Sequence, residues 1–331
     1  MRCAVVGGGA WGTALAHVLG TNGHEVMLWA REAEVVEAVN ARHENVVFLS
    51  GAALSPAVKA TSDMAAALTG ARIVMYAAPS AHLRDIAKRA APHVGKDAII
   101  GVATKGIEVG TLALMTDVVE SENNGRPVVA VSGPSFAAEV VAGQPTAIVA
   151  ASREEPPAHA VQKAFSNGHF RVYTQDDVIG VELGGALKNV MAVATGIVEG
   201  VGLGNNSRAA LITRGLAEMT RLGVAAGATA STFAGLAGLG DLVLTCTGSL
   251  SRNRAVGEAI GRGATLAEAL EGKQTVAEGV VTAKSAGQLA AKYDVEMPIV
   301  EMVNRILFEG HTARRAVNEM MTRELRPEQD A

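Results

Sequence analysis

The feature that most limits the fold of this chain lies at its start. The run Gly7 to Gly12, with the sequence Gly-Gly-Gly-Ala-Trp-Gly, matches the pattern G-x-G-x-x-G between an apolar run and a segment with helical spacing. In that setting Gly7 permits a tight turn, Gly9 lets a pyrophosphate approach the backbone, and Gly12 allows close packing of helix on strand. A chance cluster is the alternative in a chain with 37 glycines, but the flanking strand and helix favour a dinucleotide-binding loop.

The first half of the chain alternates short apolar runs with amphipathic segments. The runs predicted as buried strands are Val5-Val6, Val26 to Trp29, Ile73 to Ala77, Ile99 to Val102, Val128 to Val131 and Ala147 to Ala150. The segments predicted as helices are Gly12 to Gly20, Ala33 to Ala41, Asp63 to Leu68 and Ala81 to Ala91. Such alternation predicts a doubly wound parallel sheet of the Rossmann type. The pair Pro156-Pro157 indicates a loop.

After Val172-Tyr173 the pattern becomes helical, and no further strand is predicted. The predicted helices are Val178 to Val201, Ala209 to Ala226, Arg254 to Gly261, Val280 to Lys292, Ile299 to Phe308 and Ala313 to Met321. The fold class is therefore α/β, with an all-helical C-terminal part, and 331 residues leave room for about two domains. We predict an NAD(P)-binding Rossmann-like domain over residues 1–177 and a helical substrate-binding and catalytic domain over residues 178–331.

The charge and composition of the chain limit which kinds of ligand and partner it can bind. A formal net charge of −4 provides no general attraction for nucleic acid or anionic membranes, so an anionic ligand needs a local site. The uncharged residues 222–240 have the length of a membrane span, but their Gly, Ala, Ser and Thr content favours buried core. The two separated cysteines, Cys3 and Cys246, and a start without an apolar signal segment predict a cytoplasmic protein. No cluster has the spacing of metal ligands, so no metal is expected.

Two charged residues stand alone in apolar sequence. Lys188 is the only charge between Leu183 and Val198, and Asp241 is the only charge between Leu222 and Ser251. A buried charge is costly without a partner, so we predict that the two side chains pair. Desolvation also lowers the pKa of a lysine toward neutral pH, which makes Lys188 the candidate general acid. The alternatives are a lysine that reaches the surface and an aspartate that caps a helix.

Three further segments carry groups suited to an anionic ligand. Ser251-Arg252-Asn253-Arg254 combines hydroxyl, guanidinium and amide donors within one turn, a set suited to phosphate, although such a run alone is more often a surface helix start. Lys105 follows one predicted strand, and Gly133-Pro134-Ser135 follows the next. Ligands of doubly wound sheets bind at the carboxyl edge, so we expect both loops at one site.

The end of the second predicted strand bears on cofactor choice. An acidic residue there accepts a hydrogen bond from the ribose 2′-hydroxyl of NAD, whereas an arginine binds the 2′-phosphate of NADP. The sequence has both, as Arg31 and Glu32. We therefore expect NADP or NAD, with a preference for NADPH, and the alternative is that Glu32 sets a preference for NAD.

Taken together, these motifs closely resemble, nearly end to end, the bacterial NAD(P)-dependent glycerol-3-phosphate dehydrogenases. The segments that carry the resemblance are Gly7 to Ala16, Ala103 to Gly106, Ser132 to Ala137, Gly184 to Val190, Thr213 to Gly223, Gly238 to Thr247 and Ser251 to Asn253. The resemblance implies reversible, NAD(P)H-dependent reduction of dihydroxyacetone phosphate to sn-glycerol 3-phosphate, which supplies glycerophosphate for phospholipid synthesis. Ala10 departs from the serine of many members, so only its backbone N–H remains to serve a phosphate.

The resemblance also implies the site residues. Lys188 falls on the catalytic acid/base position. The implied substrate-binding positions are Lys105, Gly133, Ser135, Lys188, Asp241, Ser251, Arg252 and Asn253. The implied cofactor-binding positions are Gly7, Gly9, Ala10, Trp11, Gly12, Arg31, Lys105, Ala137, Arg252, Val276 and Glu278.

Two rival functions and an open question of assembly remain. Dehydrogenases of the β-hydroxyacid or 6-phosphogluconate type also combine a lysine with a helical second half. A non-catalytic NAD(P) sensor needs no lysine at position 188. The Gly-rich helical half is compatible with a homodimer, although burial within one chain explains its composition equally well.

Overall fold

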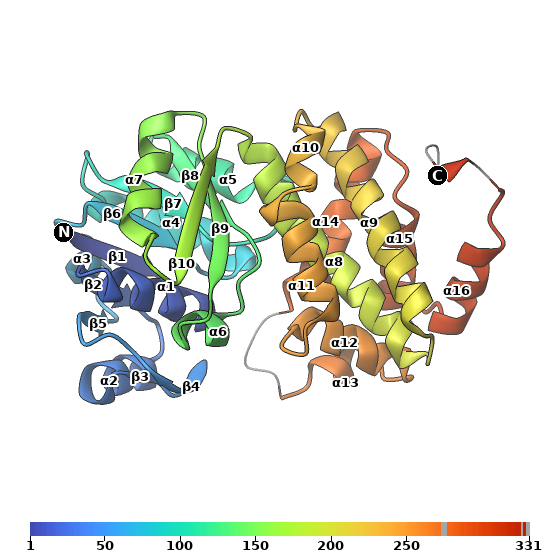
Figure 1. Cartoon of the computed structure of the whole chain (residues 1–331), viewed down its shortest axis with the longest axis horizontal. Helices are drawn as coiled ribbons and strands as arrows, with labels where there is room; N and C mark the ends of the chain where they lie inside the picture. Colours follow the sequence, from blue (N-terminus) through green and yellow to red (C-terminus); the bar gives the residue numbers. More distant parts are fainter. Residues whose placement is uncertain (273–276, 326, 329–331) are drawn as a thin grey trace.

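The computed structural model describes residues 1–272, 277–325 and 327–328. Figure 1 shows a layered sheet and helices in the N-terminal half beside a helical bundle in the C-terminal half. The strands of the main sheet are β1 (Arg2–Val6), β2 (Glu25–Trp29), β5 (Val58–Thr61), β6 (Ile73–Tyr76), β7 (Ile99–Val102), β8 (Val128–Ser132), β9 (Thr146–Ala151) and β10 (Phe170–Gln175). A separate small pair is formed by β3 (Glu44–Asn45) and β4 (Leu49–Ala53).

The main sheet confirms the predicted doubly wound architecture and corrects it at one place. Its strand order is β10-β9-β8-β7-β6-β1-β2-β5, and neighbours are parallel except for β8 and β9. The link between these two strands holds only loop and the short helix α6 (Ala137–Val141), so the chain turns back antiparallel instead of crossing over. All six predicted strands are present, whereas the edge strands β5 and β10 were not predicted.

Helices cover both faces of the sheet. One face packs against α1 (Ala10–Thr21), α2 (Ala33–Arg42) and α7 (Glu155–Phe165), and the other against α3 (Met64–Leu68), α4 (Leu83–Ala90) and α5 (Met115–Glu122). The prediction of a loop at Pro156-Pro157 is wrong. Both prolines lie in the first turn of α7, where a missing N–H breaks no helical hydrogen bond.

The C-terminal bundle is built around α8 (Val178–Gly200), which runs from the sheet into the bundle (Figure 1). The remaining helices are α9 (Asn205–Ala225), α10 (Ala230–Phe233), the π-helix η3 (Leu236–Gly240), α11 (Asp241–Thr247), α12 (Arg252–Gly261), α13 (Leu266–Leu270), α14 (Glu278–Lys292), α15 (Pro298–Phe308) and α16 (Ala313–Met321). All six predicted helices are confirmed, and α10, η3, α11 and α13 were not predicted. In the described part of the chain no strand follows β10.

Glycines bring α8 and α12 into backbone contact. A Cβ atom on Gly196 would lie 2.0 Å from the carbonyl oxygen of Arg254, and one on Gly257 would lie 2.0 Å from that of Val193. Such distances exclude any larger residue, because real Cβ atoms do not approach backbone so closely. These contacts lie in the C-terminal half of α8, and the hydrogen bond of Asn253 to Asn189 (2.9 Å) brings the start of α12 beside Lys188.

Among the described residues, two helical stretches are long and apolar enough to cross a membrane, by length and composition alone. The first is α8, whose most apolar window is 94% buried inside the protein, as expected of a core helix. The second, Ala230–Thr247, is 44% buried. The prediction that residues 222–240 are buried core is therefore wrong in part. Glycines break this stretch into the end of α9, α10 and η3, which leaves Val224 49% and Leu239 37% exposed.

Candidate active site

The glycine loop between β1 and α1 has the shape of a pyrophosphate site. Gly7 has a φ of +131°, and a Cβ atom there would lie 2.7 Å from the carbonyl carbon of Ala77. A Cβ atom on Gly12 would lie 2.0 Å from the carbonyl oxygen of Gly7. Gly9, at the N-cap of α1, has open space instead, since nothing lies within 4 Å of its Cβ position. The turn, the tight packing and the open approach correspond to the three predicted roles.

The backbone N–H groups at the start of α1 also favour a site for a diphosphate. The N–H of Thr13 donates to the carbonyl oxygen of Gly9 (2.9 Å) and is the first to close a helical turn. The preceding N–H groups of Ala10, Trp11 and Gly12 therefore lack helical acceptors and are available to an anion. The loop thus fits the diphosphate of a dinucleotide cofactor.

The other predicted cofactor residues lie in several elements. Arg31 follows β2, is 79% exposed and forms an ion pair with Glu32 (2.9 Å). Ala137 begins α6, which packs against α1. Glu278, at the start of α14, accepts a hydrogen bond from the N–H of Ser80 (3.1 Å), so it joins the bundle to the loop after β6. Val276 lies outside the described residues.

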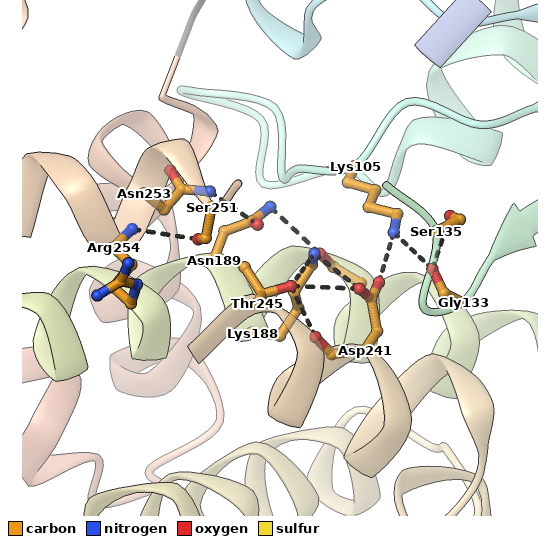
Figure 2. A network of polar contacts seen from close by, with 11 residues as sticks. Lys105, Gly133, Ser135, Lys188, Asn189, Asp241, Thr245, Ser251, Asn253 and Arg254 are labelled. Atoms are coloured by element: carbon orange, nitrogen blue, oxygen red, sulfur yellow. Dashed lines mark hydrogen bonds and ion pairs between the residues drawn. The ribbon is translucent and has the colours of Figure 1, made fainter. Parts of the chain in front are cut away.

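Lys105, Lys188 and Asp241 meet in one ionic centre (Figure 2). The ammonium Nζ of Lys188, in α8, lies 2.9 Å from Oδ1 of Asp241, in α11. The ammonium of Lys105 donates to Oδ2 of Asp241 and to the carbonyl oxygen of Gly133 (3.3 Å). The carboxylate is therefore shared by a lysine of the bundle and a lysine of the sheet edge, and the predicted pairing of Lys188 with Asp241 is confirmed.

Burial governs the ionisation of this centre. Lys188 is 7% exposed and Asp241 is 1% exposed. Burial, helped by the positive charge of Lys105, lowers the pKa of Lys188 to about 8, although Asp241 opposes that fall. Burial alone raises the pKa of Asp241, but the charges of Lys105 and Lys188 outweigh it and hold that pKa below its usual value. The result is a lysine whose pKa of about 8 lets it exchange a proton near neutral pH, beside a carboxylate whose ionised form is favoured.

Two polar neighbours of Lys188 were missed by the sequence reasoning. The hydroxyl of Thr245 donates to the backbone carbonyl of Asp241 (2.7 Å) and accepts from Nζ of Lys188 (2.6 Å). Its spacing of four residues from Asp241 places both on one face of α11 and is a signal that the sequence offered. Asn189 is only 5% exposed and bonds to Asn253, a contact that no spacing reveals.

The four residues from Ser251 to Arg254, at the start of α12, have different contacts. The hydroxyl of Ser251 caps the helix by accepting from the N–H of Arg254 (3.3 Å), and the guanidinium of Arg254 donates to the carbonyl oxygen of Gly248 (3.2 Å) and pairs with Glu199. The amide of Asn253 bonds within the protein on both sides. Among the described residues no hydrogen bond or ion pair engages the side chain of Arg252, although the charge of Glu278 interacts with it.

Gly133 and Ser135 form the other wall of the ionic centre (Figure 2). Gly133 has a φ of +143°, and a Cβ atom on it would lie 2.8 Å from Cα of Ile148, so this turn requires glycine. The hydroxyl of Ser135 donates to the carbonyl oxygen of Gly133 (3.0 Å). The sheet register places this turn near Lys105, because β7 and β8 are adjacent and parallel.

Comparisons with known proteins point to one enzyme family. Residues 2–158 match the family model for the N-terminus of NAD-dependent glycerol-3-phosphate dehydrogenase, and residues 177–318 match the model for its C-terminus. Glycerol-3-phosphate dehydrogenase (NAD(P)+) of Citrifermentans bemidjiense is 52% identical over 330 residues, covering 99% of this chain and 98% of that protein. The crystal structure of glycerol-3-phosphate dehydrogenase from Coxiella burnetii matches with a TM-score of 0.93 and 41% identity, covering 97% of this chain and 99% of that chain.

A dinucleotide loop and a buried lysine paired with a carboxylate, on this fold, define a nicotinamide-dependent dehydrogenase. Both halves of the chain match the same enzyme, and the relatives are covered along nearly their whole length. The chain belongs to the NAD-dependent glycerol-3-phosphate dehydrogenase family.

Proposed function

We propose that this enzyme works mainly in the reductive direction, converting dihydroxyacetone phosphate to sn-glycerol 3-phosphate for phospholipid synthesis, with NADPH preferred over NADH. The observation that carries the proposal is the ionic centre of Lys105, Lys188 and Asp241 together with the guanidinium of Arg252, which no hydrogen bond engages among the described residues. A substrate with a ketone carbonyl and a phosphate on separate carbons needs a proton donor and a separate cationic anchor. Glycerol-3-phosphate dehydrogenase activity with NAD(P) is the activity of its close relatives.

Lys188 is the proton donor in this proposal. Its ammonium donates a proton to the carbonyl oxygen, which becomes an alkoxide as hydride adds to the carbonyl carbon, and the ammonium stabilises that negative charge as it develops. Asp241 and Thr245 hold Nζ in place by the contacts at 2.9 and 2.6 Å. The nicotinamide cofactor, when bound, supplies the hydride.

The remaining proposed substrate residues orient the molecule. Arg252 binds the phosphate as a planar fork, and Lys105, which contacts Asp241 and the carbonyl oxygen of Gly133, completes the positive charge of the site. The other proposed members of the substrate site are Gly133, Ser135, Ser251 and Asn253. Binding energy from the remote phosphate holds the carbonyl in reacting geometry.

The cofactor site is proposed along the carboxyl edge of the sheet. The loop residues Gly7, Gly9, Ala10, Trp11 and Gly12 would hold the pyrophosphate through the backbone. Arg31 would bind the 2′-phosphate of NADP, and Ala137, Lys105, Arg252, Val276 and Glu278 complete the proposed set. The open space at Gly9 and the unpaired amides of α1 support this assignment.

Domain division, assembly and location are part of the same proposal. Residues 1–177 form the NAD(P)-binding domain and residues 178–331 the substrate-binding and catalytic domain, with Asp177 capping α8 through the N–H of Gly180 (2.8 Å) at the boundary. A homodimer is supported by the exposed apolar side chains of Leu239, Val243 and Leu250, which a second copy would cover. The two buried free thiols suit the reducing cytoplasm.

Arg252→Lys tests the phosphate role. The substitution retains the charge but loses the planar fork, so the KM for dihydroxyacetone phosphate should rise by about tenfold or more. Steady-state kinetics with dihydroxyacetone phosphate and with unphosphorylated dihydroxyacetone provide the measurement. Arg254→Lys is the matched control, because Arg254 is engaged by Glu199 and Gly248, and its KM should stay near that of the wild type. Equal turnover of both ketones by the wild type would remove this role, and with it the proposed substrate.

Arg31→Asp tests cofactor preference. The new carboxylate repels the 2′-phosphate of NADP and accepts from the free 2′-hydroxyl of NAD. The KM for NADPH should rise by about tenfold or more, since a charge-assisted hydrogen bond contributes roughly 1.5–3 kcal/mol, while the KM for NADH changes much less. Lys96→Asp makes the same change of charge at the opposite edge of the sheet, before β7, and serves as the control. An unchanged ratio of the two KM values would show that Arg31 does not reach the 2′ position.

A further inference from the structure

Asn45 joins the glycine loop to a hairpin that follows much later in the sequence. It ends β3, in the small β3–β4 pair that packs beside α2 and α6 (Figure 1). Its side chain is 0% exposed and lies against the loop between β1 and α1. Its partners there stand 32 and 37 positions earlier in the chain, so no local spacing singles this residue out.

Every polar atom of the Asn45 amide has a partner. Oδ1 accepts from the backbone N–H of Phe48, in the hairpin (3.0 Å). Nδ2 donates to the carbonyl oxygen of Gly8 (2.8 Å) and to Oγ1 of Thr13, in α1 (2.7 Å). A backbone N–H only donates, so Phe48 requires the oxygen of the amide to face it. The two N–H groups of Asn45 must therefore face the loop and α1.

The contact with Gly8 sets the direction of the next backbone N–H. The carbonyl of Gly8 and the N–H of Gly9 belong to one planar trans peptide, in which they point in opposite directions. Since the carbonyl faces the buried side chain of Asn45, the N–H of Gly9 faces away from it. Within the described chain this N–H donates to no protein group, and Gly9 is partly exposed, whereas Gly8 is buried. The peptide thus offers a donor at the proposed pyrophosphate site.

The loop alone resists rotation of this peptide only weakly. Such a rotation changes ψ of the residue before the peptide and φ of the residue after it, and here both are glycines, which tolerate most backbone angles. Turned over, the peptide would direct the carbonyl oxygen of Gly8 at the diphosphate, and two negative groups would meet. The hydrogen bond from Asn45 opposes this rotation, because losing it would leave a buried N–H of Asn45 without an acceptor.

We propose that Asn45 is a positioning residue for the cofactor, which holds the peptide between Gly8 and Gly9 so that the N–H of Gly9 donates to the diphosphate. The inference rests on the proposed binding of the cofactor at the glycine loop. Asn45 acts through the backbone and touches no part of the cofactor itself. The diphosphate is common to NADPH and NADH, so the effect is the same for both cofactors, in contrast to that of Arg31.

Asn45→Ala tests this role by cofactor binding rather than by turnover alone. Binding of NADPH and NADH to the wild type is measured first, by fluorescence titration. In Asn45→Ala the Kd for each cofactor should rise fivefold or more, and the two factors should agree within threefold, because the same donor to the same diphosphate is lost. At saturating cofactor, kcat should stay within threefold of the wild type, since Lys188 keeps all its partners.

Two matched variants separate this role from general effects on the fold. Asn40→Ala removes an amide of α2 that also pairs with backbone, here the N–H and the carbonyl oxygen of Ala60 in the edge strand β5 (both 2.9 Å). Glu44→Ala removes the acceptor for the N–H of Gly51 (2.7 Å) and so loosens the hairpin without touching the loop. Both should leave the two Kd values within twofold of the wild type. Thermal unfolding shows whether each variant is folded.

Asn45→Asp is the second variant if Asn45→Ala fails to fold. Its carboxylate has nearly the shape of the amide and still accepts from the N–H of Phe48, so the hairpin keeps its anchor. The ionised carboxylate cannot donate to the carbonyl oxygen of Gly8 and repels it. At pH 8 both Kd values should therefore rise fivefold or more, although a residue that served only the hairpin would tolerate this substitution.

Several results would overturn the proposal. They are a rise in Kd of less than fivefold for either cofactor, factors for NADPH and NADH that differ by more than threefold, and a loss of kcat of more than threefold at saturating cofactor. An equal loss of affinity in Asn40→Ala or Glu44→Ala would also overturn it, because the effect would then belong to the fold or to the hairpin. A wild type that binds neither cofactor instead contradicts the proposed cofactor site and is recognised before any variant is made.

Discussion

Lys188→Ala is expected to lower kcat for the reduction of dihydroxyacetone phosphate by a factor of about 10² to 10⁴, the usual range for loss of a single general acid. Lys188 is the buried ammonium of the ionic centre, held by Asp241 and Thr245. Its loss removes both the proton donor and the positive charge that faces the developing alkoxide. Stopped-flow or steady-state measurement of NADPH oxidation gives kcat, and fluorescence titration gives the affinity for NADPH, which should be retained.

The control for Lys188→Ala is an exposed lysine of the same half of the chain. Lys292→Ala, at the end of α14, removes a charge outside the ionic centre and should leave kcat unchanged. Thermal unfolding of each variant shows whether the bundle is intact. If Lys188→Ala keeps more than a tenth of the wild-type kcat, another group donates the proton.

Asp241→Asn should shift the pH dependence of catalysis as well as its rate. The amide keeps the shape of the side chain but removes the negative charge that faces both Lys105 and Lys188. With Asp241 ionised, the pKa of Lys188 is about 8, and loss of an opposing charge at this distance lowers a pKa by about 1–3 units. Ketone reduction uses the protonated lysine, so activity falls as pH rises through this pKa. The descending limb of kcat/KM should therefore move to lower pH, with a loss of about tenfold or more near pH 8.

The same substitution should also destabilise the protein. Removing one partner of a buried ion pair leaves an uncompensated charge, at a cost of about 3–5 kcal/mol. Chemical denaturation measures this loss, and Asp97→Asn, at an exposed position before β7, is the control. An alkaline limb at the same pH in the wild type and in Asp241→Asn would contradict the proposed coupling of Asp241 to Lys188.

The sheet could be predicted from the sequence wherever its strands are buried on both faces. Strands β1, β6, β7 and β8 form continuous apolar runs because helices cover them on each side. The edge strands β5 and β10 alternate buried and exposed residues, with Lys59 and Arg171 facing outward, and no continuous run marks them. The antiparallel direction of β9 was not predictable either, since a hydrophobic run has the same pattern in both directions.

The ionic centre illustrates which part of a site a sequence reveals. The pairing of Lys188 with Asp241 was predictable because each charge stands alone in apolar sequence, where burial demands a partner. The capping role of Ser251 is local, whereas the contacts of Asn253 and Arg254 were not predictable, because their partners lie elsewhere along the chain. Arg254 contacts Glu199 and Asn253 contacts Gly279 only after α8, α12 and α14 have packed.

The glycine contact between α8 and α12 sets a limit on how this enzyme can be re-engineered. Lys188 stands on α8 and Arg252 at the start of α12, and the backbones of these helices touch at Gly196 and Gly257. Helices α8 and α12 are already in backbone contact, so they cannot move closer, and moving them apart would lose this contact. The separation of Lys188 from Arg252 in the proposed site is thus set by the spacing of the two helices rather than by the side chains that line it. We therefore expect that accepting longer phosphorylated ketones requires a change in the packing of α8 against α12.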